Sequence, residues 1–297
     1  MRLLADMRVL AKTRLLGVSH IADSLVALSA LPGVPEATDA ARQACTELRW
    51  HQGLRRQIPQ AAAESRVRGA RASAALDGAA VDIAVVRDLM RGATAWPVSP
   101  DPLEAVLQGA VQATAETEHI RATVVTAPSQ ALARLHVAAA GHLLPEAQVG
   151  RPRQAGEISL EFSDLGPAPD ENVVRQRLSG IVELLLRAKD APAVVVAALV
   201  HAEILTVRPF VRGNGLVARA MERAVIQASG LDPTGVAVVE VGHGAEGGAA
   251  YLGALAAYGS GSPQGVALWI THCAEAIVSG AKEGGRIADA VLVGRLT

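Results

Sequence analysis

The chain has 297 residues, of which 50% are hydrophobic and 19% are charged, so it can bury a sizeable core in one large domain or in one domain with a helical extension. A formal net charge of −1 gives no bulk attraction to nucleic acid or to membrane surfaces, and 2% aromatic residues argue against single-strand binding by base stacking. No apolar run is long enough to span a bilayer, and charges from Arg2 to Arg14 interrupt any signal peptide, so we expect a cytoplasmic protein without nucleic-acid or membrane partners.

The first half of the chain shows helical spacing of apolar residues, interrupted by proline and glycine. Residues 31–35, Leu-Pro-Gly-Val-Pro, separate the first two helices, and Gly78 supplies the stop of a later one. Residues 96–102 contain several prolines and are predicted to form a loop. The helices predicted in this half cover residues 9–30, 36–57, 61–76, 81–91, 102–117 and 128–143.

The pattern changes between residues 150 and 169. Residues 157–162, Glu-Ile-Ser-Leu-Glu-Phe, alternate polar and apolar side chains, which predicts a short strand or hairpin arm. A second β signal lies at residues 236–241. The sequence therefore predicts a mainly α fold with a small β flap. The helices predicted in this half cover residues 171–188, 191–207, 215–229, 249–258 and 266–279.

The helix predicted over residues 191–207 is apolar on nearly all sides, which indicates a helix at the centre of a bundle. Asp190 is expected to cap it and Pro192 to occupy its first turn. Its run of valines is unfavourable for an isolated helix, so burial must hold it. Because packing fixes the position of a central helix, it also fixes the position of the loop that follows.

That loop, residues 208–215, reads Arg-Pro-Phe-Val-Arg-Gly-Asn-Gly and precedes another helix. We call it the GNG loop. Its glycines permit left-handed backbone angles, and the free amides of the following helix turn can then converge on one anion. A glycine-rich helix start is also found in ordinary turns, so this feature alone leaves both interpretations open.

Residues 208–219, RPFVRGNGLVAR, resemble the Fic-family motif H-P-F-x-[D/E]-G-N-G-R-x-x-R. His201 stands seven residues before the motif, where many family members carry a histidine. Leu135-His136 and Gly150-Arg151-Pro152-Arg153 resemble the approach to the family's β-hairpin flap, and the segment from Tyr251 to Trp269 resembles its closing helices. The motif positions that match are Pro209, Phe210, Gly213, Asn214, Gly215 and Arg219.

The resemblance covers about residues 61–285. It implies a Fic-like helical bundle with a small β-hairpin flap over residues 61–297, preceded by an N-terminal helical extension over residues 1–60. Ser73-Ala74-Ala75-Leu76-Asp77-Gly78 resembles the family's autoinhibitory S/T-x-x-x-E-[G/N] helix, with Asp77 in place of glutamate. In the family this glutamate pairs with the last arginine of the motif. We therefore expect an ion pair between Asp77 and Arg219, direct or water-bridged, with a structural role.

Three motif positions that carry chemistry differ from the family pattern. The family's histidine accepts a proton from the target hydroxyl that attacks the α-phosphate of ATP, whereas the guanidinium of Arg208 stays protonated. The acidic residue that holds Mg²⁺ is replaced by Arg212, which repels the ion, and the phosphate-contacting arginine is replaced by Leu216. The resemblance thus implies no catalytic residue and no metal site in this loop.

Two roles remain for the altered loop. The amides of Gly213, Asn214 and Gly215 could bind a nucleotide or phosphate without Mg²⁺, helped by Arg208, Arg212 and Arg219. Alternatively, Arg208 and Arg212 point to solvent or pair with carboxylates such as Glu203 or Glu222.

No histidine has the companions of a replacement base. His201 is expected to be a hydrogen-bonded core residue and His243 a turn residue. Cys45 and Cys273 have no metal-ligand spacing and are expected in the core, as in other proteins of reducing compartments.

The favoured hypothesis is a Fic-like pseudoenzyme that acts by binding an anion, a nucleotide or a protein partner. A partner segment could add to the flap at about residues 150–165. One alternative is an active transferase of a nucleotidyl or other phosphate-containing group by an altered, metal-free mechanism. Another is an interaction module in which residues 1–60 form the arm of a homodimer.

Overall fold

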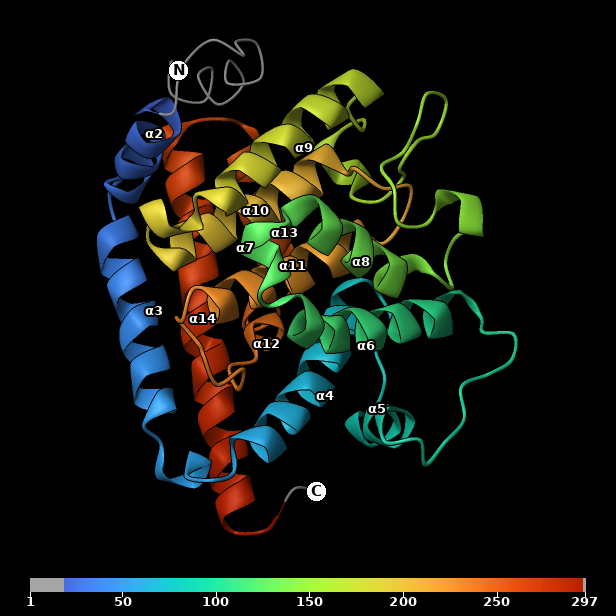
Figure 1. The fold of residues 1–297 in the computed structure, drawn as a ribbon, viewed down its shortest axis with the longest axis vertical. Coiled ribbons are helices and arrows are strands. Elements are labelled where there is room, and N and C mark those ends of the chain that lie inside the picture. Colours follow the sequence, from blue (N-terminus) through green and yellow to red (C-terminus); the bar gives the residue numbers. More distant parts are fainter. Residues whose placement is uncertain (1–18, 296–297) are drawn as a thin grey trace.

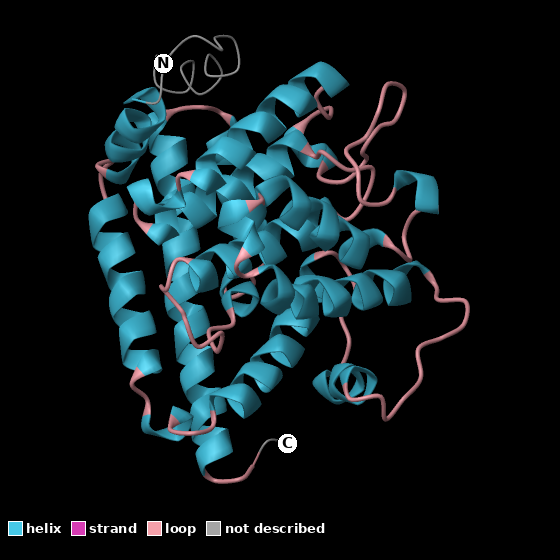
Figure 2. Cartoon of the chain, in the orientation of Figure 1, coloured by secondary structure: helices cyan, strands magenta, loops and turns pink. Residues whose placement is uncertain are grey.

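Helices form nearly all of the regular structure in residues 19–295, the residues that the computed structural model describes (Figures 1 and 2). No strand occurs in this range, so the mainly α fold class is confirmed. The part of the first predicted helix that precedes Ser19 lies outside the described residues. The helices are α2 (Ser19–Ser29), α3 (Val34–Arg49), α4 (Ile58–Leu76), α5 (Ile83–Met90), α6 (Pro102–Ile120), α7 (Thr123–Thr126), α8 (Pro128–Ala140), α9 (Glu171–Leu186), α10 (Ala193–Val207), α11 (Asn214–Ala228), α12 (Val239–His243), α13 (Gly248–Gly259) and α14 (Pro263–Leu292), with 3-10 turns η1 (Gln52–Leu54), η2 (Glu146–Gln148), η3 (Ser163–Leu165) and η4 (Ala188–Asp190).

Helix α10 is the centre of the bundle, as its uniformly apolar sequence predicts. It packs against α9, α11 and α14, and its side chains from Val194 to Val200 are buried. The prediction that Asp190 caps this helix was wrong. Asp190 lies in η4, and its Oδ2 is 3.6 Å from Arg187 Nη1. The extended backbone of Ala191 and Pro192 separates Asp190 from the amides of the first turn of α10.

Helix α14 is much longer than the sequence predicts because glycines that suggest an end are packing positions inside it. A Cβ atom at Gly280 would lie 2.7 Å from the backbone carbon of Val238, and one at Gly284 would lie 2.8 Å from the Leu48 side chain. Each glycine therefore lets a neighbouring segment approach the helix closely. Figure 1 shows α14 running along the molecule beside α3.

The described part of the predicted N-terminal extension packs on the rest of the chain. Helix α3 buries Val34, Ala41, Cys45 and Leu48, and it lies against α14. The apolar face that a dimerisation arm would offer to a second copy is therefore covered by the chain itself at α3.

Neither predicted β segment is a strand. Residues 157–162 form an irregular loop, and residues 236–241 lead into the short helix α12. Val236, Ala237 and Val238 are apolar because they are buried, and the Val238 amide donates to the Gly280 carbonyl of α14 at 3.0 Å. Burial among helices thus accounts for the apolar run that the sequence pattern assigns to a sheet. Within residues 19–295, no helix has both the length and the apolarity needed to cross a bilayer.

Candidate functional site

The side chain of Asn214 closes the GNG loop, because it bonds both backbone groups of Phe210. Asn214 Oδ1 accepts a hydrogen bond from the Phe210 amide at 3.0 Å, and its Nδ2 donates to the Phe210 carbonyl at 2.9 Å. Gly213 has a φ of 86°, a left-handed angle that glycine adopts without strain. Arg208 also has a positive φ, 48°, where α10 ends. Gly213 and the side chain of Asn214 thus shape the GNG loop.

The amides of the GNG loop bind a carboxylate of the same chain. The Gly213 amide donates to Glu161 Oε1 at 2.7 Å, and the Asn214 amide donates to Glu161 Oε2 at 2.9 Å. Asn214 Nδ2 adds a third bond to Oε2, at 2.7 Å. Burial raises the pKa of the Glu161 carboxyl above its usual value, against these hydrogen bonds, which lower it. The anion at this helix N-terminus is therefore Glu161.

Arg208 fastens the segment that contains Glu161. Its guanidinium is buried and donates to the carbonyl oxygens of Glu161 and Phe162, each at 3.2 Å, and to those of Gly166 and Pro167, each at 2.9 Å. The alternatives expected from sequence, solvent or a carboxylate such as Glu203 or Glu222, were both wrong for Arg208. Left-handed backbone at Phe162 and Gly166 curls the chain so that these carbonyls converge on one side chain.

A second arginine holds the same segment, residues 150–169, which we call the covering segment. The Arg153 amide donates to the Pro209 carbonyl at 2.8 Å, and its Nε donates to the Arg208 carbonyl at 2.8 Å. Its guanidinium also contacts the Pro169 carbonyl. These bonds fasten the covering segment to the start of the GNG loop.

The polar and apolar side chains of residues 158–161 lie on opposite faces of the covering segment, with the apolar ones outward. Ser159 is 5% exposed, and its Oγ accepts a hydrogen bond from Asn214 Nδ2 at 3.3 Å. Asn214 thus contacts both Ser159 and Glu161. Ile158 and Leu160 are 65% and 78% exposed. The inner face of the covering segment thus packs on the GNG loop, while its outer face presents apolar side chains to solvent.

The other altered motif positions do not form a charged pocket with Arg208. The side chain of Arg212 is exposed, and only its carbonyl belongs to the loop's hydrogen bonding, at 3.2 Å from His136 Nε2. Leu216 is buried, and its Cδ1 lies 3.0 Å from where a Cβ of Gly109 would stand. The sequence left open whether Arg212 binds an anion or points to solvent, and in the structure it points to solvent. Leu216 is a core residue.

The predicted ion pair between Asp77 and Arg219 is present, with Arg219 Nη2 2.9 Å from Asp77 Oδ1. Arg219 is buried, and its Nε also donates to Ser73 Oγ at 2.8 Å while its Nη2 donates to the Ser73 carbonyl at 3.0 Å. Gly78 ends α4 with a φ of 90°. The end of α4 is therefore joined to α11, the helix that starts at the GNG loop.

A buried histidine cluster lies behind the loop. His201 Nδ1 donates to Glu222 Oε2 at 2.7 Å, and His243 Nε2 donates to the same oxygen at 2.6 Å. Burial lowers the pKa of His201 to about 4, whereas His243 and His201 hold the pKa of Glu222 well below its usual range despite its burial. His201 is a hydrogen-bonded core residue, as predicted. His243 was predicted to be a turn residue, but it is buried at the end of α12.

A cavity of about 380 Å³ opens beside the covering segment, between it, α9, the end of α10 and the end of α13. Its wall includes Arg208 and the pair of Arg177 and Glu203, whose Nη2 and Oε1 lie 2.6 Å apart. The Tyr258 hydroxyl donates to Glu203 at 2.6 Å. Glu203 is thus paired with Arg177, and no sequence pattern marks this partner, because it lies on another helix.

No protein-family model matches the chain, and no curated protein matches its sequence. Solved structures of Fic proteins do match its fold. Residues 134–508 of Fic-1 from C. elegans align with a TM-score of 0.63 and 18% identity over 84% of this chain and 71% of that one. A Fic family protein from Desulfovibrio desulfuricans G20 aligns with a TM-score of 0.64 and 20% identity over 83% of this chain and 73% of that one. A Fic domain containing signaling protein from Bacteroides thetaiotaomicron aligns with a TM-score of 0.65 and 13% identity over 84% of this chain and 98% of that one. The chain therefore has the Fic fold.

Proposed function

We propose that this chain is a binding protein on the Fic fold that does not transfer nucleotides to other proteins. The observation that carries the proposal is the Glu161 carboxylate on the amides of Gly213 and Asn214, because a phosphate bound at this helix start would need the same donors. Arg208 strengthens it, since its side chain is occupied by carbonyls and cannot accept a proton.

The outer face of the covering segment is the proposed contact for a protein partner. Ile158 and Leu160 are exposed side by side in an alternating sequence, while the inner face is fixed by Arg153 and Arg208. An extended partner segment could lie along this face and place apolar side chains on these two residues. A nucleotide or phosphate, bound without Mg²⁺, becomes a ligand of the GNG loop only when Glu161 is displaced.

The test is incubation of the full chain with labelled ATP and cell lysate, beside a variant that carries Arg208→His, Arg212→Asp and Leu216→Arg. We expect no transferred label with the natural sequence. A control that adds Glu161→Ala to the triple variant asks whether the carboxylate itself keeps nucleotide out. Label transfer by the natural sequence would contradict the proposal and favour a transferase with an altered mechanism.

A further inference from the structure

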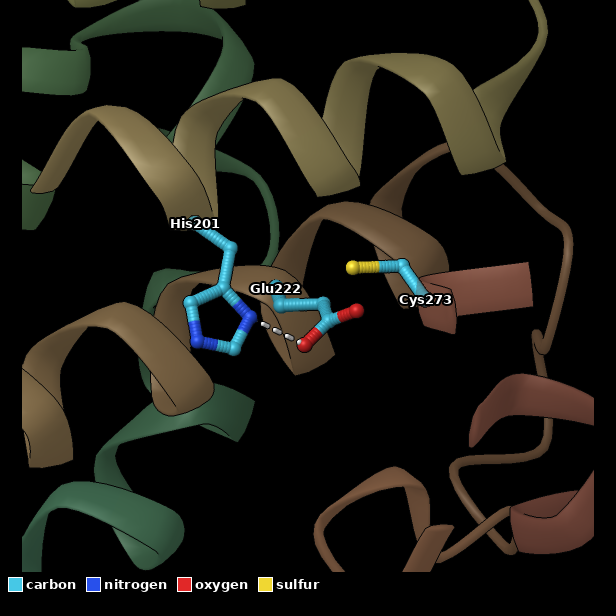
Figure 3. A group of neighbouring side chains, drawn as sticks. All are labelled: His201, Glu222 and Cys273. Carbon is cyan, nitrogen blue, oxygen red and sulfur yellow. Dashed lines mark hydrogen bonds and ion pairs between the residues drawn. The ribbon is translucent and has the colours of Figure 1, made fainter. Parts of the chain in front are cut away.

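Three helices bring potential metal ligands together in the core. His201 comes from α10, Glu222 from α11 and Cys273 from α14, and Figure 3 shows the three side chains pointing toward one another. The His201 ring nitrogen, a Glu222 carboxylate oxygen and the Cys273 sulfur all lie within 4.8 Å of one another, and all three residues are buried. Imidazole, thiolate and carboxylate are the ligand types that zinc prefers in proteins.

Glu222 carries an unsatisfied oxygen in this cluster. Its Oε2 accepts from His201 and His243, but its buried Oε1 has no hydrogen-bond partner among the described residues. In Figure 3 the carboxylate oxygen without a dashed line lies on the side of the Cys273 sulfur. A buried carboxylate oxygen without a partner is unfavourable, and a cation between it and the sulfur would satisfy it.

Each histidine has a partner on its second ring nitrogen, as metal-bound imidazoles do, and metal binding requires that His201 Nδ1 and His243 Nε2 give up the protons they donate to Glu222. His201 Nε2 lies 2.8 Å from the Tyr251 hydroxyl, and His243 Nδ1 lies 3.2 Å from His272 Nε2. Both rings therefore direct the remaining nitrogen at Glu222. His272 is only half-buried, so the cluster reaches toward solvent on that side.

We propose that His201, Glu222 and Cys273 bind one divalent transition metal ion, with zinc as the best fit, and that His243, whose Nε2 lies 2.6 Å from Glu222 Oε2, turns in as the fourth ligand. A thiolate and a carboxylate offset the two positive charges, and two neutral imidazoles complete a tetrahedral set. Ligand atoms around zinc lie about 2.0–2.3 Å from the metal. The hydrogen-bonded distances of 2.6 and 2.7 Å at Glu222 must then lengthen to about 3.3 Å, the separation of two ligands on a tetrahedral zinc ion, and the Cys273 sulfur moves inward. The ion would join α10, α11, α12 and α14, independently of the GNG loop.

The experiment uses the full chain, treated with a chelator and then loaded with Zn²⁺ or Co²⁺. Elemental analysis after desalting should find one equivalent of zinc. X-ray absorption of the zinc form should show one sulfur at about 2.3 Å and nitrogen or oxygen ligands at about 2.0–2.1 Å. The cobalt form should show a thiolate-to-metal charge-transfer band in the near ultraviolet.

The chain offers a matched control, because Cys45 and Cys273 are both buried free cysteines. Cys273→Ala should abolish the charge-transfer band and weaken zinc binding by at least about tenfold, whereas Cys45→Ala should change neither. A band that survives in Cys273→Ala, or one that Cys45→Ala removes, overturns the proposal. If Cys273→Ala does not fold, the absorption spectrum of the natural protein decides, because a zinc form without a sulfur ligand overturns the proposal. Failure to retain zinc at all means that the cluster is a hydrogen-bonded core without metal, which also overturns it.

Discussion

Glu161 Oε1 accepts a 2.7 Å hydrogen bond from the Gly213 amide, so a side chain of the covering segment occupies the N-terminus of α11. The residues that shape the GNG loop would serve equally to hold a phosphate, and here they hold a carboxylate. Because the two residues are far apart in sequence, this contact closes a long loop over the end of α10. The covering segment and the anion site are therefore mutually dependent.

Glu161→Ala is predicted to free the amides of Gly213 and Asn214 for an external anion. We expect inorganic phosphate to bind this variant in the roughly millimolar range, measured by calorimetry or by amide shifts, and not to bind the natural protein. The free energy of unfolding should fall by about 1–3 kcal/mol because three hydrogen bonds are lost.

Glu157→Ala is the control for this prediction. Glu157 belongs to the same segment, but its carboxylate pairs with Arg151 at 2.7 Å and does not touch the GNG loop. The substitution removes the same charge without exposing the amides. Phosphate binding by Glu157→Ala equal to that of Glu161→Ala would refute the assignment of the anion site.

Arg208→Lys is predicted to loosen the covering segment while the positive charge is kept. Lysine cannot reproduce the fork that reaches four carbonyls from Glu161 to Pro167. Amide hydrogen exchange in residues 157–169 should become at least about tenfold faster, equivalent to about 1.4 kcal/mol of lost protection. Exchange in α10 should change little, because its core side chains are untouched. Unchanged exchange in the covering segment would show that Arg208 does not hold it.

The helices could be predicted because helical periodicity, proline and glycine are local signals. The central place of α10 followed from its apolar sequence alone, and the Asp77–Arg219 pair followed from the resemblance to a motif. Helix ends were less predictable. Gly280 and Gly284 suggest an end of α14, but their task is close packing against segments that only the fold brings near.

The partners of Arg208 and of Glu222 could not be predicted from the sequence. Every residue has a carbonyl, so nothing in the sequence marks those of Gly166 and Pro167 as the acceptors for Arg208. His243 and Glu222 lie on separate helices, and no spacing rule joins them. Such contacts depend on tertiary packing. The alternation at residues 157–162 predicts a strand, and in the structure its apolar side chains Ile158 and Leu160 face outward while the polar Ser159 is buried.

Gly215→Ala is predicted to break the contact between α4 and α11. A Cβ atom at this position would lie 2.6 Å from Asp77 Oδ1 and 2.8 Å from Oδ2, so the carboxylate must move away from Arg219. We expect a loss of about 1–3 kcal/mol in the free energy of unfolding, measured by denaturant titration. Gly180→Ala in α9 is the matched control, since nothing lies within 4 Å of its Cβ position. The control should gain about 0.5–1 kcal/mol, and a loss of the same size in both variants would contradict the prediction.

His136 is predicted to make the fold sensitive to acid. Its ring stacks on Phe210 at 3.8 Å between centroids, and its Nδ1 accepts from the Gly150 amide at 3.0 Å. Burial lowers the pKa of His136 from 6.5 to about 4, and Arg151 adds to this effect against the Arg212 carbonyl. As the pH falls below 6.5 the unfolded chain therefore binds the proton first, and stability is lost between pH 6.5 and 4.

A shift of this size corresponds to at most about 3 kcal/mol from this residue. His136→Asn should be less stable than the natural protein at pH 7, because the stacked ring is lost. It lacks the titrating group, however, so the difference in the free energy of unfolding between the two proteins should shrink by up to about 3 kcal/mol on going to pH 4. Urea titrations at several pH values measure this difference. A difference that stays constant from pH 7 to pH 4 would mean that His136 accepts its proton equally well in the folded and unfolded chains.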